Sequence, residues 1–122
     1  MRWQRKLVRA TNRTRNTVLG DSIRVADTGL TRVVGLLGER ALAVGDGLLI
    51  VPSQGVHTLG MAFAIDVVIL DHEWTTLAIW PNMRPFRMTR VFFKAAAVLE
   101  LPVGTVVASR TEVGDVLDFD RV

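Results

Sequence analysis

The chain has 122 residues, of which 49% are hydrophobic and 22% charged, and a length and apolar content of this kind suit one folded domain and exclude general disorder. It contains no cysteine, which excludes disulfides, thiolate nucleophiles and thiolate metal sites. The net charge of +3 is uneven, because residues 1–24 hold seven basic residues and one acidic residue, whereas the other positions hold eight basic and eleven acidic.

The basic N-terminal stretch, residues 1–16, reads MRWQRKLVRATNRTRN. Trp3, Leu7 and Ala10 fall at helical spacing among basic residues, as in a short helix that lies on nucleic acid or anionic lipid. We favour the alternative, a disordered tail. We therefore assign residues 1–16 to a basic N-terminal arm and residues 17–122 to a single α+β domain. No apolar run typical of a secretory signal follows the arm, and we expect a cytoplasmic protein.

The body begins with residues 17–26, which predict one or two short strands broken near Gly20. The next segment, residues 27–42, is the most helix-like part of the chain. Its apolar residues recur at helical spacing, and they are Leu30, Val33, Val34 and Leu37.

Two apolar runs then predict strands. Residues 48–52, LLIVP, read as a short buried strand. Residues 61–71, MAFAIDVVILD, lack polar alternation, which is typical of a central strand covered on both faces. Residues 71–73 allow a tight reversal into TTLAIW, residues 75–80, so we expect a β-hairpin.

The C-terminal part starts with residues 81–90, which contain two prolines and three arginines and predict a surface loop. Residues 95–101, AAAVLEL, form either a strand or a short helix. A turn at Gly104, a helical turn to Arg110 and a strand after Gly114 complete the chain. These elements predict an α+β fold with a mostly antiparallel, barrel-like β-sheet and one or two short helices.

Four segments of the body are similar to a widespread prokaryotic family, classified as domain of unknown function family 192. They are VADTGLTRVVGLLG (25–38), GDGLLIVPSQGVHTLGMAFAIDVVILD (45–71), VLELPVG (98–104) and GD.L.F ending at Phe119. The resemblance implies a compact α+β fold with a barrel-like sheet, and it implies no agreed activity. It carries over to these positions of the chain: His57, Thr58, Gly60, Met61, Asp66 and Glu100.

The chain departs from the family pattern at three positions. Ser53 stands where members with the His-Thr motif tend to have cysteine, and Ala62 and Val34 stand where they tend to have arginine. A family site that used a thiol, or two arginines that hold an anion, would be lost here.

The polar residues just before the long apolar run form the best candidate site. His57 and Met61 are donors that favour copper, but in an extended chain they lie about 13 Å apart, and they share a metal only if the chain turns at Gly60. We therefore assign no metal and no cofactor. The simpler interpretation is that His57 donates to a backbone carbonyl, Met61 packs in the core and Thr58 is an ordinary strand residue.

Two acidic residues in apolar runs are the other candidates. Asp66 interrupts AFAI and VVIL, so we expect an ion pair with Arg32 or Arg40, or a carboxylate that caps backbone N–H groups. Glu100, in the apolar run VLEL, is interpreted in the same way, as an acidic residue with an ion pair or with backbone N–H donors. If both acids converged beside His57, they would supply general acid and base catalysis, as for hydrolysis.

The leading hypothesis is a binding or accessory domain rather than an enzyme, with a pocket near His57, Thr58 and Met61 for an unidentified small molecule or protein. The first alternative is a small hydrolase that uses His57 with Asp66 or Glu100. The second is a peripheral binder of nucleic acid or an anionic membrane through residues 2–15, which the loop arginines would extend: Arg84, Arg87 and Arg90. The high apolar content is also compatible with a homodimer.

Overall fold

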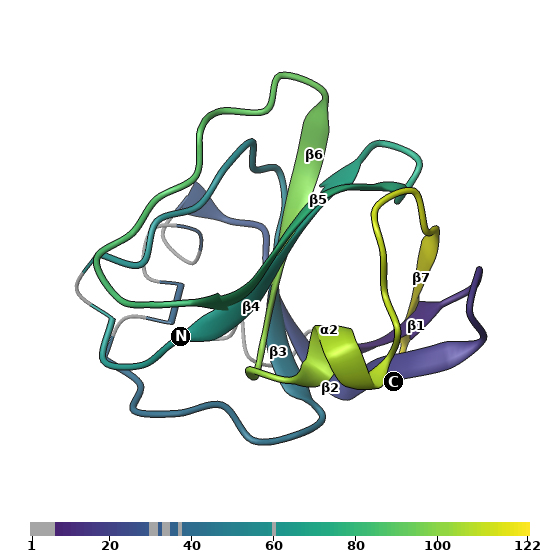
Figure 1. Cartoon of the computed structure of the whole chain (residues 1–122), viewed down its shortest axis with the longest axis horizontal. Coiled ribbons are helices and arrows are strands. Elements are labelled where there is room, and N and C mark those ends of the chain that lie inside the picture. Colours follow the sequence, from purple (N-terminus) through teal and green to yellow (C-terminus); the bar gives the residue numbers. More distant parts are fainter. Residues whose placement is uncertain (1–6, 30–31, 33–34, 37, 60) are drawn as a thin grey trace.

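Seven strands and one short helix make up the regular elements of the computed structural model, which describes residues 7–29, 32, 35–36, 38–59 and 61–122. The elements in chain order are β1 (Leu7–Asn12), β2 (Thr17–Ala26), β3 (Asp46–Ile50), β4 (Ile65–Asp71), β5 (Thr76–Met83), β6 (Ala95–Leu101), α2 (Thr105–Ala108) and β7 (Leu117–Arg121). The strands form one sheet in the order β5-β4-β6-β3-β2-β1-β7 (Figure 1). Neighbouring strands are antiparallel except β2 and β3, which are parallel.

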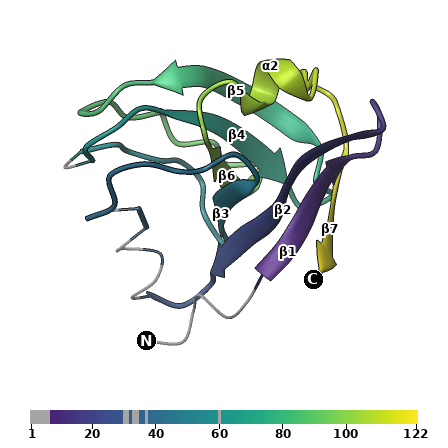
Figure 2. The ribbon, with the colours of Figure 1, turned by 90° about the horizontal axis from the view of Figure 1, so that it is seen from below.

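The sheet curls strongly but is not closed into a barrel, as Figure 1 and Figure 2 show. The two edges meet just before β5 and β7 begin, where Thr75 and Val116 form an isolated bridge and a few backbone hydrogen bonds join residues 74–76 to residues 114–117. Closure requires a continuous ladder between the two edges, and none extends from this bridge in the described part of the chain. The expected mostly antiparallel sheet is confirmed, whereas the barrel-like α+β fold is corrected to a mostly β fold with an open, mixed sheet, in which α2 is a four-residue helix.

Strand β1 differs from the expectation for the N-terminal arm. Residues 7–12 pair with β2 on one side and β7 on the other, so the sheet begins before the expected boundary at Thr17. Ala10 and Asn12 are buried while Arg9 is exposed, which is the alternation of a strand and not the spacing of a helix. Residues 1–6 lie outside the described residues.

The helix expected within residues 27–42, with a stop at Gly38, can be followed only in part, because its four periodic apolar residues lie outside the described residues. Within the described part, the N–H of Arg32 donates to the carbonyl of Thr28 at 3.0 Å, which is one helical hydrogen bond. Gly38 has φ 84°, the left-handed conformation that commonly follows a helix end.

The remaining elements largely follow the sequence. The β4–β5 hairpin, the short strand β3 and the terminal strand β7 are confirmed, and residues 95–101 form a strand. Strand β4 is shorter than expected, because it begins at Ile65. Strand β5 continues through Pro81 to Met83, so the surface loop begins at Arg84 and not at residue 81.

The two faces of the sheet carry two apolar clusters, which follow the two-residue period of the strands. One face, the Leu48 face, carries Leu48, Ile50, Val67, Ile69 and Val98. The opposite face, the Leu49 face, carries Leu49, Val68, Leu70, Leu99 and Leu101. Six of the seven residues of β4 are buried, since this strand is covered on both faces as its sequence predicted.

Candidate functional site

A cavity of about 230 Å³ lies on the Leu48 face of the sheet. Its apolar lining comes mainly from Leu36, Ile50, Val56 and Met61, and its polar lining comes from Arg32, Ser53, His57 and Glu100. The cavity thus brings together three of the five candidate residues, His57, Met61 and Glu100, whereas Thr58 and Asp66 lie outside its lining.

Glu100 is the buried acidic group of the cavity. The register pairs it with Leu48 of β3 and Val67 of β4, so its side chain shares the Leu48 face. Its exposed fraction is 3%, and no described residue donates a hydrogen bond to its carboxyl group. Burial, and to a smaller extent the negative charge of Glu39, raise the pKa of Glu100 from the ordinary 4.5 to about 8.

The nearby cation Arg24 has a different partner. Arg24 lies in the same row across the sheet, because β2 pairs it with Leu48, which in turn pairs with Glu100. Its Nη2 donates to both carboxylate oxygens of Glu39 at 2.9 Å. Arg24 therefore compensates Glu39, and among the described residues Glu100 has no ion-pair partner.

His57 and Met61 contribute to the cavity in different ways. Met61 is buried with the apolar cluster of the Leu48 face, as expected. His57 is exposed at the cavity, and its backbone forms an isolated antiparallel bridge with Met88. The expected hydrogen bond from the imidazole to a backbone carbonyl is absent among the described residues. The ring is thus available to a ligand or to solvent.

Thr58 holds a loop and does not line the cavity. Its hydroxyl donates to the carbonyl of Arg84 at 2.6 Å and accepts from the N–H of Arg87 at 2.9 Å. Its own backbone N–H donates to the carbonyl of Arg87, and its carbonyl accepts from Phe86. Thr58 is completely buried, so these bonds fix the start of the surface loop.

Asp66 is a backbone-capping carboxylate on the Leu49 face. Its Oδ1 accepts from the N–H of Asn82 at 2.8 Å, and its Oδ2 accepts from the N–H groups of Gly104 and Val106 at 3.1 and 2.9 Å. It therefore joins the end of β5 to the start of α2. The expected pairing with Arg32 or Arg40 does not occur, whereas the capping alternative does.

Arg32, like Ser53, is a polar lining residue that the sequence did not assign to a pocket. Its guanidinium donates to the carbonyls of Thr28 and Pro52, which holds an exposed side chain at the cavity. In the sequence, Arg32 was marked only by its place in the segment whose apolar residues recur at helical spacing, and such a place does not predict a cavity. A second, more open cavity of about 620 Å³ adjoins at Arg32, Pro52 and Ser53.

Two further searches of the structure concern metals and membranes. Within the residues that the structure describes, no three His, Asp or Glu side chains are grouped so as to hold a metal ion. None of the described helices is long and apolar enough to cross a membrane.

Comparisons with known proteins identify a family and two similar structures. The family model DUF192, described as uncharacterized ACR, matches residues 9–119. A protein of unknown function from Novosphingobium aromaticivorans DSM 12444 is 19% identical with a TM-score of 0.77, over 91% of this chain and 82% of that chain. A putative transcription regulator from Sinorhizobium meliloti 1021 is 23% identical with a TM-score of 0.75, over 92% and 91% of the two chains. No curated protein sequence matches this chain significantly.

Proposed function

The chain belongs to the DUF192 family, whose description assigns no activity, and we propose from its own cavity that it binds a small molecule that carries a basic nitrogen. The supporting observation is Glu100, a carboxyl group that is 3% exposed, lines a cavity and accepts no hydrogen bond from a described residue. A ligand ammonium group would supply the partner that the described side chains do not.

The electrostatics of Glu100 favour a cationic ligand group. Burial disfavours the ionised carboxylate, and the charge of Glu39 disfavours it further, so the group is protonated at neutral pH. An ammonium group in contact with Glu100 would stabilise the ionised form and displace the proton. A ligand carboxylate in the same position could only accept a hydrogen bond from the neutral acid.

The remaining lining suits a short, mostly apolar molecule. Leu36, Ile50, Val56 and Met61 form a wall for a hydrocarbon part. A volume of about 230 Å³ is below the usual range for drug-sized ligands, which favours a compact molecule. Arg32 and His57 would meet any polar end that points away from Glu100.

Three probes of equal chain length but different charge test this proposal: butylammonium, butyramide and butyrate. NMR titration of the protein with a labelled Met61 methyl group would report occupancy, because Met61 lines the cavity. We expect butylammonium to shift this signal at the lowest concentration. Glu100→Gln should remove the preference for the amine, whereas the exposed control Glu73→Gln should retain it. Equal or better binding of butyrate would refute the cationic ligand, and no shift with any probe would refute the cavity as a binding site.

Proton release provides a second readout. Calorimetric titration in two buffers of different ionisation enthalpy at pH 6.5 should show release of about one proton per bound amine, since a carboxyl group with a pKa of about 8 is almost fully protonated there. Binding without proton release would show that the amine does not contact Glu100.

A small hydrolase remains the alternative because His57 and Glu100 line the same cavity. In this case a protonated Glu100 would act as general acid and His57 as general base. Asp66 is not part of this proposal, since its oxygens accept three backbone N–H groups on the other face. Turnover of small esters or amides that is lost in both His57→Ala and Glu100→Gln would favour the hydrolase, and retained turnover in either variant would reject it.

A further inference from the structure

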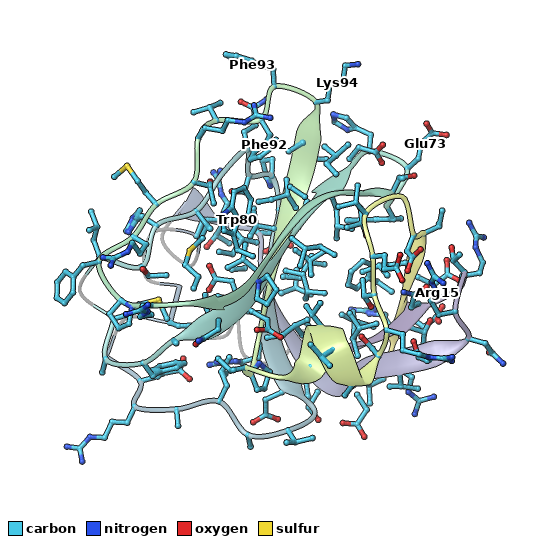
Figure 3. All side chains as sticks on the ribbon, viewed as in Figure 1. Arg15, Glu73, Trp80, Phe92, Phe93 and Lys94 are labelled. Atoms are coloured by element: carbon cyan, nitrogen blue, oxygen red, sulfur yellow. The ribbon has the colours of Figure 1, made fainter. Side chains whose placement is uncertain are left out.

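The loop between β5 and β6, residues 84–94, presents apolar and cationic side chains to solvent together. Its exposed hydrophobic residues include Phe86 and Met88, each 66% exposed, Val91 and Phe93, which is 84% exposed. Its exposed cations are Arg84, Arg87, Arg90 and Lys94. In Figure 3, Phe93 and Lys94 both point outward from this loop, whereas Trp80 and Phe92 point inward. Apolar groups of this size are seldom left in water over one short segment without a partner.

The loop is fixed on the body of the protein. Besides the contacts of Thr58 with Arg84, Phe86 and Arg87, the N–H of Thr89 donates to the carbonyl of Val56 at 2.9 Å. The Oγ1 of Thr89 accepts from the N–H of Val56 at 3.1 Å. These contacts tie the loop to the segment just before Met61, so its exposed side chains form a preorganised surface.

The base of the loop is also packed. Phe92 is buried, with its ring edge-on to Trp80 at 5.7 Å, and the guanidinium of Arg90 lies 3.9 Å from the centre of the Phe92 ring. The N–H of Phe92 donates to the carbonyl of Gln54 at 2.7 Å. The exposed side chains on either side of Phe92 are therefore held away from the core.

The charged residues of this loop all have one sign. No acidic residue occurs between Glu73 and Glu100 in the sequence, and none occurs in the adjoining segment 54–59. Glu100 is buried and lines the cavity. Asp71 and Glu73 lie near the C-terminal end of the loop, because Asp71 pairs with Ala95. The part from Arg84 to Arg90 is therefore the most uniformly positive.

We propose that the loop of residues 84–94 docks on an anionic lipid surface, with Phe86, Met88 and Val91 inserted at the interface and the neighbouring cations on the lipid headgroups. Apolar side chains among arginines and lysines suit such an interface, because both terms add to the binding. Phe86 and Phe93 are planar and could stack on bases, but Met88 and Val91 offer no planar surface, and a lipid interface accommodates all four apolar side chains. A second copy that used the same loop would bring the same positive charge against it, which opposes a symmetric dimer through this surface. This proposal is independent of the cavity.

Vesicle flotation with the full chain tests the proposal, with phosphatidylcholine vesicles that contain or lack phosphatidylglycerol. The apolar variant is Phe86→Ser with Met88→Ser, and the charge variant is Arg84→Gln with Arg87→Gln. The matched control is Val107→Ser with Arg110→Gln, which alters an exposed apolar residue and a cation elsewhere on the surface. Thermal melts establish that each variant is folded.

We expect the wild type to float only with vesicles that contain phosphatidylglycerol, and to be released by salt. The charge variant should bind at least tenfold more weakly, because each arginine near an anionic surface contributes roughly a fivefold change in affinity. The apolar variant should also bind at least tenfold more weakly, because it removes two side chains that are inserted at the interface. The control should bind as the wild type does.

Four results would overturn the proposal. The first is no flotation with anionic vesicles, and the second is equal flotation with neutral vesicles. The third is unchanged binding in both folded loop variants, which would move the interface elsewhere on the chain. The fourth is a wild-type dimer, measured by sedimentation, that both loop variants dissociate, since this would assign the surface to a second copy. If the first result were accompanied by retention of nucleic acid, the surface would be assigned to nucleic acid.

Discussion

Asp66 and Glu100 lie on neighbouring strands but on opposite faces of the sheet. The register pairs Asp66 with Leu101 and Val67 with Glu100, and side chains of paired residues share a face. Asp66 therefore faces α2, where it accepts three backbone N–H groups, whereas Glu100 faces the cavity without a described donor. Two acids in similar apolar surroundings thus have different roles, and they cannot act as a pair on one substrate.

Glu100 should make the protein less stable as the pH rises. Its pKa is raised on folding from 4.5 to about 8, so between these values the folded state binds more protons than the unfolded state. The free energy of unfolding should therefore fall as the pH rises from about 5 to 8, by an amount on the order of a few kcal/mol. Glu100→Gln should remove this slope and be more stable than the wild type at pH 8.

Denaturant unfolding at several pH values measures this effect, with Glu73→Gln as the control because Glu73 is exposed. The control should keep the slope of the wild type. Parallel curves for wild type and Glu100→Gln would show that Glu100 is not a buried, unpaired acid in solution.

Asp66→Ala should destabilise the fold without affecting the cavity. The substitution leaves the N–H groups of Asn82, Gly104 and Val106 without their acceptor, at a cost of roughly 3 kcal/mol in the free energy of unfolding. Asp120→Ala, on an exposed residue of β7, should cost less than about 0.5 kcal/mol. Chemical denaturation measures both, and an equal effect of the two changes would contradict the capping role.

The sequence predicted strand positions better than strand pairing. Apolar runs of limited length and a tight reversal were enough for β3, β4 and the β4–β5 hairpin. The segment from Leu7 to Asn12 was different, because Leu7 and Ala10 continue the helical spacing that begins at Trp3, and the favoured interpretation was a disordered tail. What decided for the strand is the pairing with β2 and β7, and β7 lies at the other end of the sequence.

The sequence predicted only part of the candidate site, because the pairing of distant strands again decided the rest. The segment before the long apolar run did place His57 and Met61 at a cavity. The sequence could not reveal that Glu100 joins them and Asp66 does not, because this depends on a register between two strands that are far apart in the chain. Nor could the spacing of Thr58 show that its hydroxyl binds a loop almost thirty residues further on.

Thr58→Val should loosen the surface loop. The change keeps the shape of the side chain but removes the hydroxyl that donates to Arg84 and accepts from Arg87. Since Thr58 is buried, we expect a loss of roughly 1 to 3 kcal/mol and faster amide exchange at Arg87. Thr58→Ser, which keeps the hydroxyl, is the control and should protect the Arg87 amide better. Unchanged exchange in Thr58→Val would mean that the backbone bonds alone hold the loop.

Asp115 should contribute to the acid sensitivity of the protein. Burial alone would raise its pKa, but hydrogen bonds from Arg15, Asn12 and the N–H of Glu112, together with the charge of Arg15, outweigh burial and lower the pKa from 3.8. The stability that Asp115 provides is therefore complete above the unfolded pKa and is lost as the pH falls through the lower folded value. Asp115→Asn should flatten the decline of stability below about pH 4 relative to the wild type. A decline as steep as that of the wild type would assign acid unfolding to other carboxylates.

Removal of the N-terminal residues should separate the role of β1 from that of the residues before it. A deletion of residues 1–16 removes a strand that lies between β2 and β7, and with it Asn12, whose side chain donates to Thr111 and Asp115 at 3.1 and 2.9 Å. We expect this variant to be unfolded or to melt far below the full chain, because β7 loses the strand with which it forms its ladder. A deletion of residues 1–6 retains every described contact and is the matched control, with an expected melting temperature close to that of the full chain.

Circular dichroism melts compare the three proteins. A stable, fully folded 1–16 deletion would show that the N-terminal segment is an appendage of the domain after all, and equal loss of structure in both deletions would place the essential contacts before Leu7.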